Sequence, residues 1–286
     1  MESKRSLDDY QLPPGKTAVV VGATTGIGAA VARKLSSVGC SRVIILGRNE
    51  ERGMEVINRM KQLSKEKVQA DFVKGDISYA RGIKDAFDSI KSALSDVQVD
   101  YIVMCQNGPP TGTINLNEDG EGTGFTIQVI SRFLLAYLFA SHALISQGGK
   151  VMFITNPGLS YDGLDIDDLS LKKVAENGRS RVLLTVDQSE RDSTVLDSVT
   201  LVSHLSLWDS MLQKVHYSYS TNDSLNISST MFIQPHIPVQ MLASADLGQG
   251  KFWDLKLKPK SPGKWASDRG NREKLWDKLL TMTGSR

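Results

Sequence analysis

The sequence has few of the residues that metal sites, disulfide frameworks and nucleic-acid surfaces need. Its two cysteines, Cys40 and Cys105, lack metal-site spacing, and so low a cysteine content is typical of a reducing compartment. The formal net charge is only +2, whereas nucleic-acid-binding domains are usually far more basic. The sequence therefore predicts no metal site and no nucleic-acid partner.

Long apolar runs are absent as well. The longest strongly apolar stretch, residues 133–145, is interrupted by Ser141 and His142 and is too short to cross a bilayer. Residues 1–9 are charged and polar and do not form a signal-peptide pattern. We therefore expect a cytoplasmic protein without a membrane partner.

Apolar, β-rich segments do alternate with longer helical patterns. This alternation is typical of βαβ units and predicts one Rossmann-like α/β domain over residues 1–286, built on a doubly wound parallel sheet. The predicted strands are 17–21, 42–46, 68–74, 101–105, 150–155 and 227–233. The predicted helices are 26–39, 50–63, 80–94, 124–147 and 198–216, and a short extended piece and a final helix follow within 250–280.

The alternation stops after residue 155. Residues 156–197 contain turn residues and a tract rich in Ser, Asp and Arg. So long an irregular stretch inside an α/β domain is either a functional lid or disordered. Because it follows the carboxyl end of a strand, where ligands bind in open sheets, we predict a substrate lid over residues 158–197.

A glycine-rich segment links the first strand to the first helix. It reads Val-Gly-Ala-Thr-Thr-Gly-Ile-Gly over residues 21–28. Glycines at such a turn let the backbone approach a pyrophosphate, which then faces the free N–H groups of the helix. The alternative is a tight strand–helix turn without a ligand. The residues expected to bind the cofactor here are Gly22, Thr24, Thr25, Gly26, Ile27 and Gly28.

The residues after the second strand indicate which dinucleotide binds. A carboxylate there would bind the adenosine ribose and repel a 2′-phosphate, but the chain has Arg48 and Asn49, with Arg52 nearby. A guanidinium pairs well with a phosphate, so we expect NADPH or NADP⁺. A solvated loop arginine is the alternative.

These motifs resemble the short-chain dehydrogenase/reductase family over about residues 15 to 280, and the tail resembles its retinol-dehydrogenase-like branch. The resemblance implies adenine contacts from Asp76 and Ile77. It also puts Asn107 and Gly108 at the family's Asn-Ala-Gly position.

The family's catalytic Tyr-x-x-x-Lys pair is missing, since none of the seven tyrosines has a lysine four residues on. Alignment puts Gln128 at the family's asparagine, Asn156 at its serine, Thr200 at its tyrosine and His204 at its lysine. We count Asn156 and His204 among the residues expected at the cofactor. Three interpretations remain: a non-enzymatic nucleotide binder, a different proton donor, or a substrate that needs no such acid.

The replacement chemistry is expected from Arg132, one helical turn after Gln128, and from the acidic loop that contains Asp165 and Asp167. The alternatives are a structural or interface ion pair for Arg132 and a solvated loop for the acids. A buried arginine among leucines would need an anionic partner.

A degenerate member with these features resembles the fungal NADPH-dependent reductase/Diels–Alderases of malbrancheamide- and paraherquamide-type alkaloids. The resemblance implies a small-molecule alkaloid precursor, with Arg132 and Asp167 as the catalytic residues and Asp165 as the alternative acid. The expected reaction is reduction of an iminium-like prenylated indole diketopiperazine precursor, followed by an intramolecular [4+2] closure. The alternatives are an atypical carbonyl reductase and an inactive nucleotide-binding scaffold. We expect a homo-oligomer formed through the apolar helices.

Overall fold

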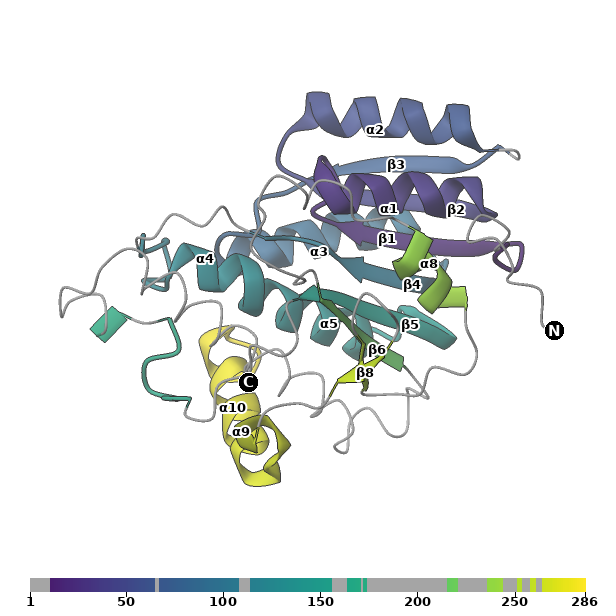
Figure 1. Ribbon diagram of the computed structural model, residues 1–286. Coiled ribbons are helices and arrows are strands. Elements are labelled where there is room, and N and C mark those ends of the chain that lie inside the picture. The colour runs from purple at the N-terminus through teal and green to yellow at the C-terminus, as the bar shows by residue number, and fades with distance from the viewer. Residues whose placement is uncertain are drawn as a thin grey trace, which may run out of the picture.

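A computed structural model of the chain shows a mostly parallel sheet with helices on both faces (Figure 1). The structure describes residues 11–64, 67–107, 114–155, 164–170, 172–173, 215–220, 236–243, 251–253, 258–260 and 264–286. Within these residues the strand order is β3-β2-β1-β4-β5-β6-β7-β8, and only β8 is antiparallel to its neighbour. The strands are β1 (Lys16–Val21), β2 (Cys40–Gly47), β3 (Gln69–Lys74), β4 (Val99–Met104), β5 (Ile145–Thr155), β6 (Val215–Ser220), β7 (Lys251–Trp253) and β8 (Pro259–Lys260). The order reverses direction between β1 and β4, so the predicted doubly wound, Rossmann-like class is confirmed.

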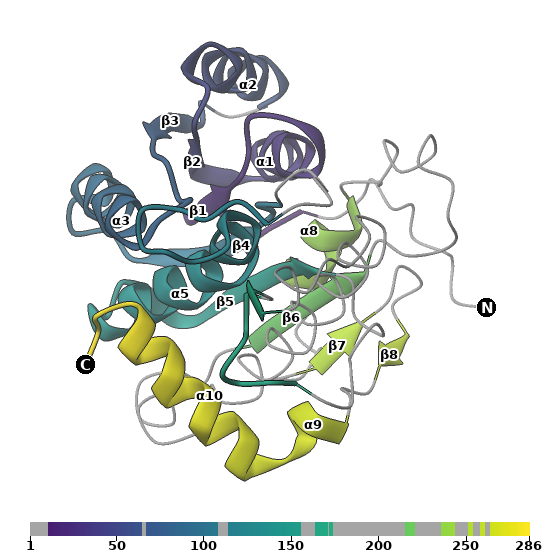
Figure 2. The ribbon, with the colours of Figure 1, turned by 90° about the vertical axis from the view of Figure 1, so that its left-hand side faces the viewer.

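The helices form two layers (Figure 2). One face of the sheet carries α1 (Gly26–Ser37), α2 (Glu50–Leu63) and α8 (His236–Ala243). The other carries α3 (Ala80–Leu94), α4 (Thr123–Phe125), η1 (Thr126–Ile130), α5 (Ser131–Ser141), α9 (Lys264–Ser267) and α10 (Arg269–Met282). Each layer has its own apolar core against the sheet, as helices on both faces of a parallel sheet require.

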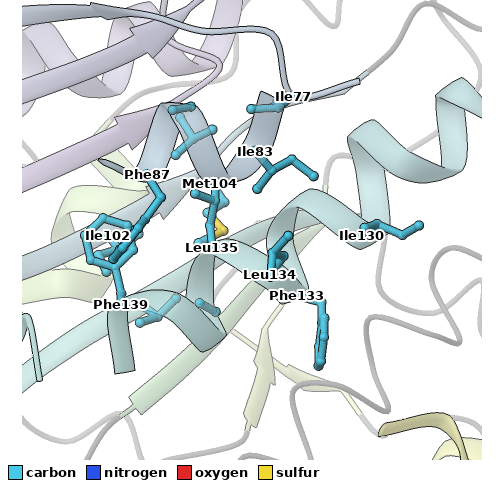
Figure 3. Packing of buried hydrophobic residues seen from close by; sticks show 14 of the residues in the cluster. Ile77, Ile83, Phe87, Ile102, Met104, Ile130, Phe133, Leu134, Leu135 and Phe139 are labelled. Atoms are coloured by element: carbon cyan, nitrogen blue, oxygen red, sulfur yellow. The ribbon is translucent and has the colours of Figure 1, made fainter. Parts of the chain in front are cut away.

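The core below α3 and α5 fixes the position of the helix that follows β4. Phe87 of α3 meets Phe139 of α5 edge to face, with ring centroids 5.3 Å apart. Ile102 and Met104 of β4 are fully buried beneath them (Figure 3). Because both helices and the strand share this interior, α5 and the turn before it are held rigidly at the carboxyl end of β4.

The outer face of α5 is covered by α10 of the same chain. Trp276 lies edge-on to Phe133, with ring centroids 5.0 Å apart, and Leu279 is fully buried beside it. The continuous helix Thr123–Ser141 is long and apolar enough to cross a membrane, but 67% of its apolar window is buried inside the fold, as in a core helix. An oligomer would therefore need a surface other than this face of α5.

Two predicted helix ends are wrong. The helix predicted to reach residue 147 ends at Ser141, because Ala143 takes a positive φ of 52° and turns the chain into β5. Ile145, predicted as helical, pairs with Val99 of β4. The helix predicted to end at residue 216 overlaps β6, whose alternating aromatic residues suit a strand. The rest of that helix and the predicted strand 227–233 lie outside the described residues. The single-domain prediction over 1–286 is untested and stays a prediction.

Candidate cofactor groove

A groove of about 740 Å³ opens at the carboxyl ends of β1 to β4. It brings together eleven residues that the sequence predicts at the cofactor. These are Gly22, Thr24, Thr25, Gly26, Ile27, Gly28, Arg48, Asn49, Asp76, Ile77 and Asn107. Cys105, Gln106 and Ile127 also line the groove but were not predicted at the cofactor. Cys105 and Gln106 immediately precede the predicted Asn107, and Ile127 precedes Gln128. Their position next to predicted residues could therefore have identified them.

The first turn needs its glycines for different reasons. Gly22 has a φ of +74°, and a Cβ there would lie 2.7 Å from the Cα of Gln106. A Cβ on Gly28 would lie 2.3 Å from the carbonyl oxygen of Gly22, so α1 can pack against β1 only with glycine. Gly26 has a φ of +56° with nothing within 4 Å of its Cβ position, which leaves open space on the groove side. The backbone is therefore exposed where a pyrophosphate would sit.

The start of α1 can receive an anion. Its N-cap residue, Thr25, makes no side-chain capping hydrogen bond, and the first turn contains no acidic residue. The N–H groups of that turn and the positive end of the helix dipole thus face the groove.

Arg48 gives the groove a positive wall at the end of β2. The neighbouring Asn49 caps α2 by accepting a hydrogen bond from the backbone N–H of Arg52 at 2.9 Å. Arg48 itself is exposed, and no described residue forms an ion pair or hydrogen bond with its side chain. Its guanidinium is therefore available to a ligand.

The wall beside it follows β3, the neighbour of β2 in the sheet. Asp76 accepts a hydrogen bond from the backbone N–H of Ser78 at 3.0 Å, which tightens the turn into α3. Ile77 is 8% exposed and packs into the core while lining the groove. An apolar side chain such as Ile77 next to a carboxylate such as Asp76 suits the flat, hydrogen-bonding ring of an adenine.

Arg132 is buried behind the groove, with 2% of its surface exposed. Its guanidinium donates hydrogen bonds to the backbone carbonyls of Gln128 at 2.6 Å, Gln106 at 2.7 Å and Ile154 at 2.9 Å. The dipoles of these three backbone carbonyls stabilise its charge, and the anionic partner expected from the sequence stays a prediction. Arg132 thereby joins α5 to the ends of β4 and β5.

Gln106 connects the same network to the groove. Its side-chain amide donates to the Ser131 hydroxyl at 3.0 Å, and that hydroxyl donates to the carbonyl of Ile127 at 2.6 Å. Burial raises the pKa of the adjacent Cys105 thiol to about 12, although the nearby Arg132 charge acts in the opposite direction. Cys105 is therefore a neutral thiol at physiological pH and not a nucleophile.

The helix after β4 has an unusual turn at Gln128, the residue that the sequence alignment is expected to place at the family's asparagine. Residues 126–130 form the π-helical segment η1 between α4 and α5. Single π-turns often lie at functional sites, because they widen the helix and redirect side chains. Gln128 is half-buried here, and its carbonyl is fixed by Arg132.

The acidic residues lie elsewhere in the described structure. Asp167 is 75% exposed at its side chain, and its carboxylate lies 3.8 Å from the ammonium group of Lys278 on α10. Asp165 is exposed and accepts a hydrogen bond from the backbone N–H of Asp167 at 2.9 Å. An Arg132–Asp167 pair is not among these contacts. Gly108, Asn156, Thr200 and His204 lie outside the described residues, as does most of the predicted lid.

Comparisons with known proteins agree with this geometry. The family model for short chain dehydrogenases matches residues 16–158. An uncharacterized oxidoreductase of Bacillus subtilis, YvaG, is 27% identical over 191 residues, which cover 65% of this chain and 69% of that protein.

Two solved structures share the fold. A crystal structure of an uncharacterized protein from Mycobacterium paratuberculosis has a TM-score of 0.75 at 18% identity and covers 98% of this chain and 97% of that chain. The landomycin C-6 ketoreductase LanV, solved with bound NADP and rabelomycin, has a TM-score of 0.58 at 18% identity, with 86% and 96% covered. The family model spans half of the chain and contains all eleven predicted residues that line the groove, so the chain belongs to the short-chain dehydrogenase family.

Proposed function

We propose that this oxidoreductase binds NADP(H) in the groove and reduces a small organic molecule whose acceptor carbon is already cationic. The observation that carries the cofactor assignment is the exposed Arg48 guanidinium at the end of β2, where an NAD-preferring protein would place a carboxylate. The relative LanV, which was solved with NADP, supports the same cofactor class.

The groove residues fit such a dinucleotide. Arg48 and Arg52 would hold the 2′-phosphate, and Asp76 with Ile77 would contact the adenine. The turn at Gly26 and the start of α1 would hold the pyrophosphate. Gln106 and Ile127 would line the nicotinamide end of the groove, and a bound dinucleotide would supply the hydride there.

The proposal of a cationic hydride acceptor rests on the acid–base residues that the sequence lacks. No tyrosine has a lysine four residues on, which is the spacing of the pair that would donate a proton to a carbonyl oxygen. Cys105, the thiol in the groove wall, has its pKa raised to about 12 by burial and serves no acid–base role near neutral pH. An iminium carbon needs no proton, because accepting the hydride neutralises its charge, and the protein must then only align it.

The finer proposal rests on the resemblance to the fungal alkaloid enzymes. The substrate would be an iminium or zwitterionic prenylated indole diketopiperazine-type precursor, reduced to an azadiene that closes by an intramolecular [4+2] reaction. Asp167, with Asp165 in reserve, would stabilise the cationic substrate. Arg132 would fix the carbonyls around it, as it does for Gln106 and Ile154 in the structure.

A carbonyl reductase is the second candidate. It is favoured by LanV, a ketoreductase with the same fold. A panel of simple ketones separates the two: negligible NADPH oxidation with ketones and stereospecific oxidation with cyclic iminium ions would support the proposal. Brisk turnover of ketones would favour the second candidate, and no NADPH oxidation with either panel would favour a scaffold.

Calorimetry tests the cofactor assignment. NADPH should bind the unmutated protein more tightly than NADH, and Arg48→Asp should abolish or invert this preference. Arg59→Asp is the matched control, because Arg59 is exposed on the same side of the sheet but does not line the groove. Equal affinities for NADPH and NADH in the unmutated protein would disprove the assignment.

A further inference from the structure

A compact loop between β4 and α4 contacts both walls of the groove. We call residues 114–122 the bridging loop. An antiparallel bridge between Leu116 and Gly122 closes it, and the backbone N–H of Asn117 donates to the carbonyl of Glu121 at 2.8 Å. Gly120, with a φ of +71°, makes the tight turn between them. The loop is thus a defined structure that can hold a side chain in a fixed position.

The side chain that it holds is Asn117, whose amide is fully used. Its Oδ1 accepts hydrogen bonds from the backbone N–H groups of Asp119 at 3.0 Å and Glu121 at 2.9 Å. Its Nδ2 donates to the carbonyl of Ser78 at 2.8 Å and to the hydroxyl of Thr126 at 2.9 Å. Backbone N–H groups can only donate, so this orientation of the amide is required and its two donors must face Ser78 and Thr126.

Those two partners adjoin opposite walls of the groove. Ser78 directly follows Asp76 and Ile77, which line the groove after β3. Thr126 is fully buried and directly precedes Ile127, which lines it beside β4. One amide therefore joins two segments that come from different sides of β1 in the sheet.

A second contact docks the loop onto the same wall. The Asp119 carboxylate accepts a hydrogen bond from the backbone N–H of Ala80 at 2.6 Å. Ala80 begins α3, and the N-cap residue Tyr79 supplies no side-chain capping bond of its own. Asp119, which is distant in the sequence, thus caps the N-terminus of α3 in place of Tyr79. This contact fixes the bridging loop against the β3–α3 connection.

From this geometry we propose that Asn117 is a positioning residue that sets the spacing between the two walls of the groove. The inference rests on the proposed function, namely that the groove binds NADP(H). A dinucleotide must touch both walls at once, and a pocket held in its bound spacing avoids an ordering cost on binding. Asn117 would thus act on affinity through Ser78 and Thr126 without touching the ligand.

The test uses two neutral variants and one matched control. Asn117→Ala removes both donors, and Thr126→Val removes one acceptor with little change of volume. Gln98→Ala removes a comparable amide donor, to the carbonyl of Ala143 at 2.8 Å, at the start of β4 and so at the opposite edge of the sheet. Dissociation constants for NADPH are measured by calorimetry well below each melting temperature, so that only folded protein is titrated.

Asn117→Ala should weaken NADPH binding about tenfold, and Thr126→Val should weaken it about threefold. Gln98→Ala should leave it within about twofold. If Asn117→Ala does not fold, Thr126→Val against Gln98→Ala still decides the matter. Lower melting temperatures with an unchanged dissociation constant would make the loop merely structural and overturn the inference. An unmutated protein that binds no NADPH would instead overturn the proposed function, and the inference with it.

Discussion

The guanidinium of Arg132 donates a hydrogen bond to the backbone carbonyl of Gln106 across 2.7 Å, at the carboxyl end of β4. Gln106 lines the groove, so this bond connects the buried helix α5 directly to the groove wall. The same guanidinium holds Ile154 near the end of β5. Arg132 is therefore placed to align two strand ends with the π-helical turn rather than to reach into the groove.

The first prediction concerns this contact. Arg132→Met keeps much of the side-chain volume but leaves the carbonyls of Gln106, Ile154 and Gln128 without their donor, so it should lower the free energy of unfolding by about 3 kcal/mol or more. NADPH affinity should also fall, since the groove wall is no longer fixed. Urea unfolding and calorimetry measure the two effects.

Arg81→Met is the control, because Arg81 is exposed on α3 and its ion pair among the described residues is with Asp85 at 3.9 Å. It should cost no more than about 0.5 kcal/mol. If Arg132→Met matches this control in stability and NADPH affinity yet loses product formation, Arg132 acts on the substrate, as predicted from the sequence.

Local chemistry made the cofactor half predictable from the sequence. The turn at Gly22 and Gly28 requires glycine for steric reasons within one strand–helix unit, and Arg48 and Asp76 follow directly from strand ends. Parallel strands place such ends at one edge of the sheet, so eleven predicted residues meet in the groove.

The remaining features depend on contacts between distant segments. The sequence shows Arg132 among apolar residues, but not that its described partners are carbonyls from Gln106 and Ile154. Nothing local marks Asn117, whose partner Ser78 lies 39 positions away. The end of α5 was misjudged because residues 142–147 look helical by composition, while pairing with β4 decides their conformation.

The second prediction separates backbone strain from ligand contact. Gly26 and Gly148 both have positive φ angles, +56° and +74°, with nothing within 4 Å of the Cβ position. Alanine at either position should therefore lower the free energy of unfolding by a similar amount, roughly 1–2 kcal/mol. Only Gly26 lines the groove, so only Gly26→Ala should weaken NADPH binding, by about tenfold or more, in calorimetry. Equal NADPH affinity in the two variants would mean that the backbone at Gly26 does not approach the ligand.

The third prediction concerns alkaline pH. Burial raises the pKa of the Cys40 thiol from 9.0 to about 12 and that of the Tyr101 hydroxyl from 10.0 to about 12, with the neighbouring Asp100 charge adding to both. The folded state then holds protons that the unfolded state releases, so the contribution of these two groups to the free energy of unfolding should be constant below about pH 9 and be lost between pH 9 and about 12. Urea titrations across that range measure it. Cys40→Ala should make the decline shallower, and an identical pH profile in this variant would show that Cys40 does not contribute.

The last prediction tests the role of Asp167, whose described partner is Lys278 on α10. At 75% side-chain exposure and a separation of 3.8 Å, this ion pair should stabilise the fold by no more than about 0.5 kcal/mol. If Asp167 stabilises a cationic substrate, Asp167→Asn should cut product formation at least tenfold, roughly, by removing the negative charge, while NADPH affinity stays unchanged.

Lys278→Met breaks the same ion pair but keeps the carboxylate, so it should leave product formation nearly intact. Equal losses of product formation in the two variants would mean that the ion pair only holds the segment of Asp167 against α10. Undiminished product formation in Asp167→Asn would instead favour Asp165 as the acidic residue. Because both variants remove one contact between the same two side chains, the difference between their rates isolates the carboxylate's own contribution.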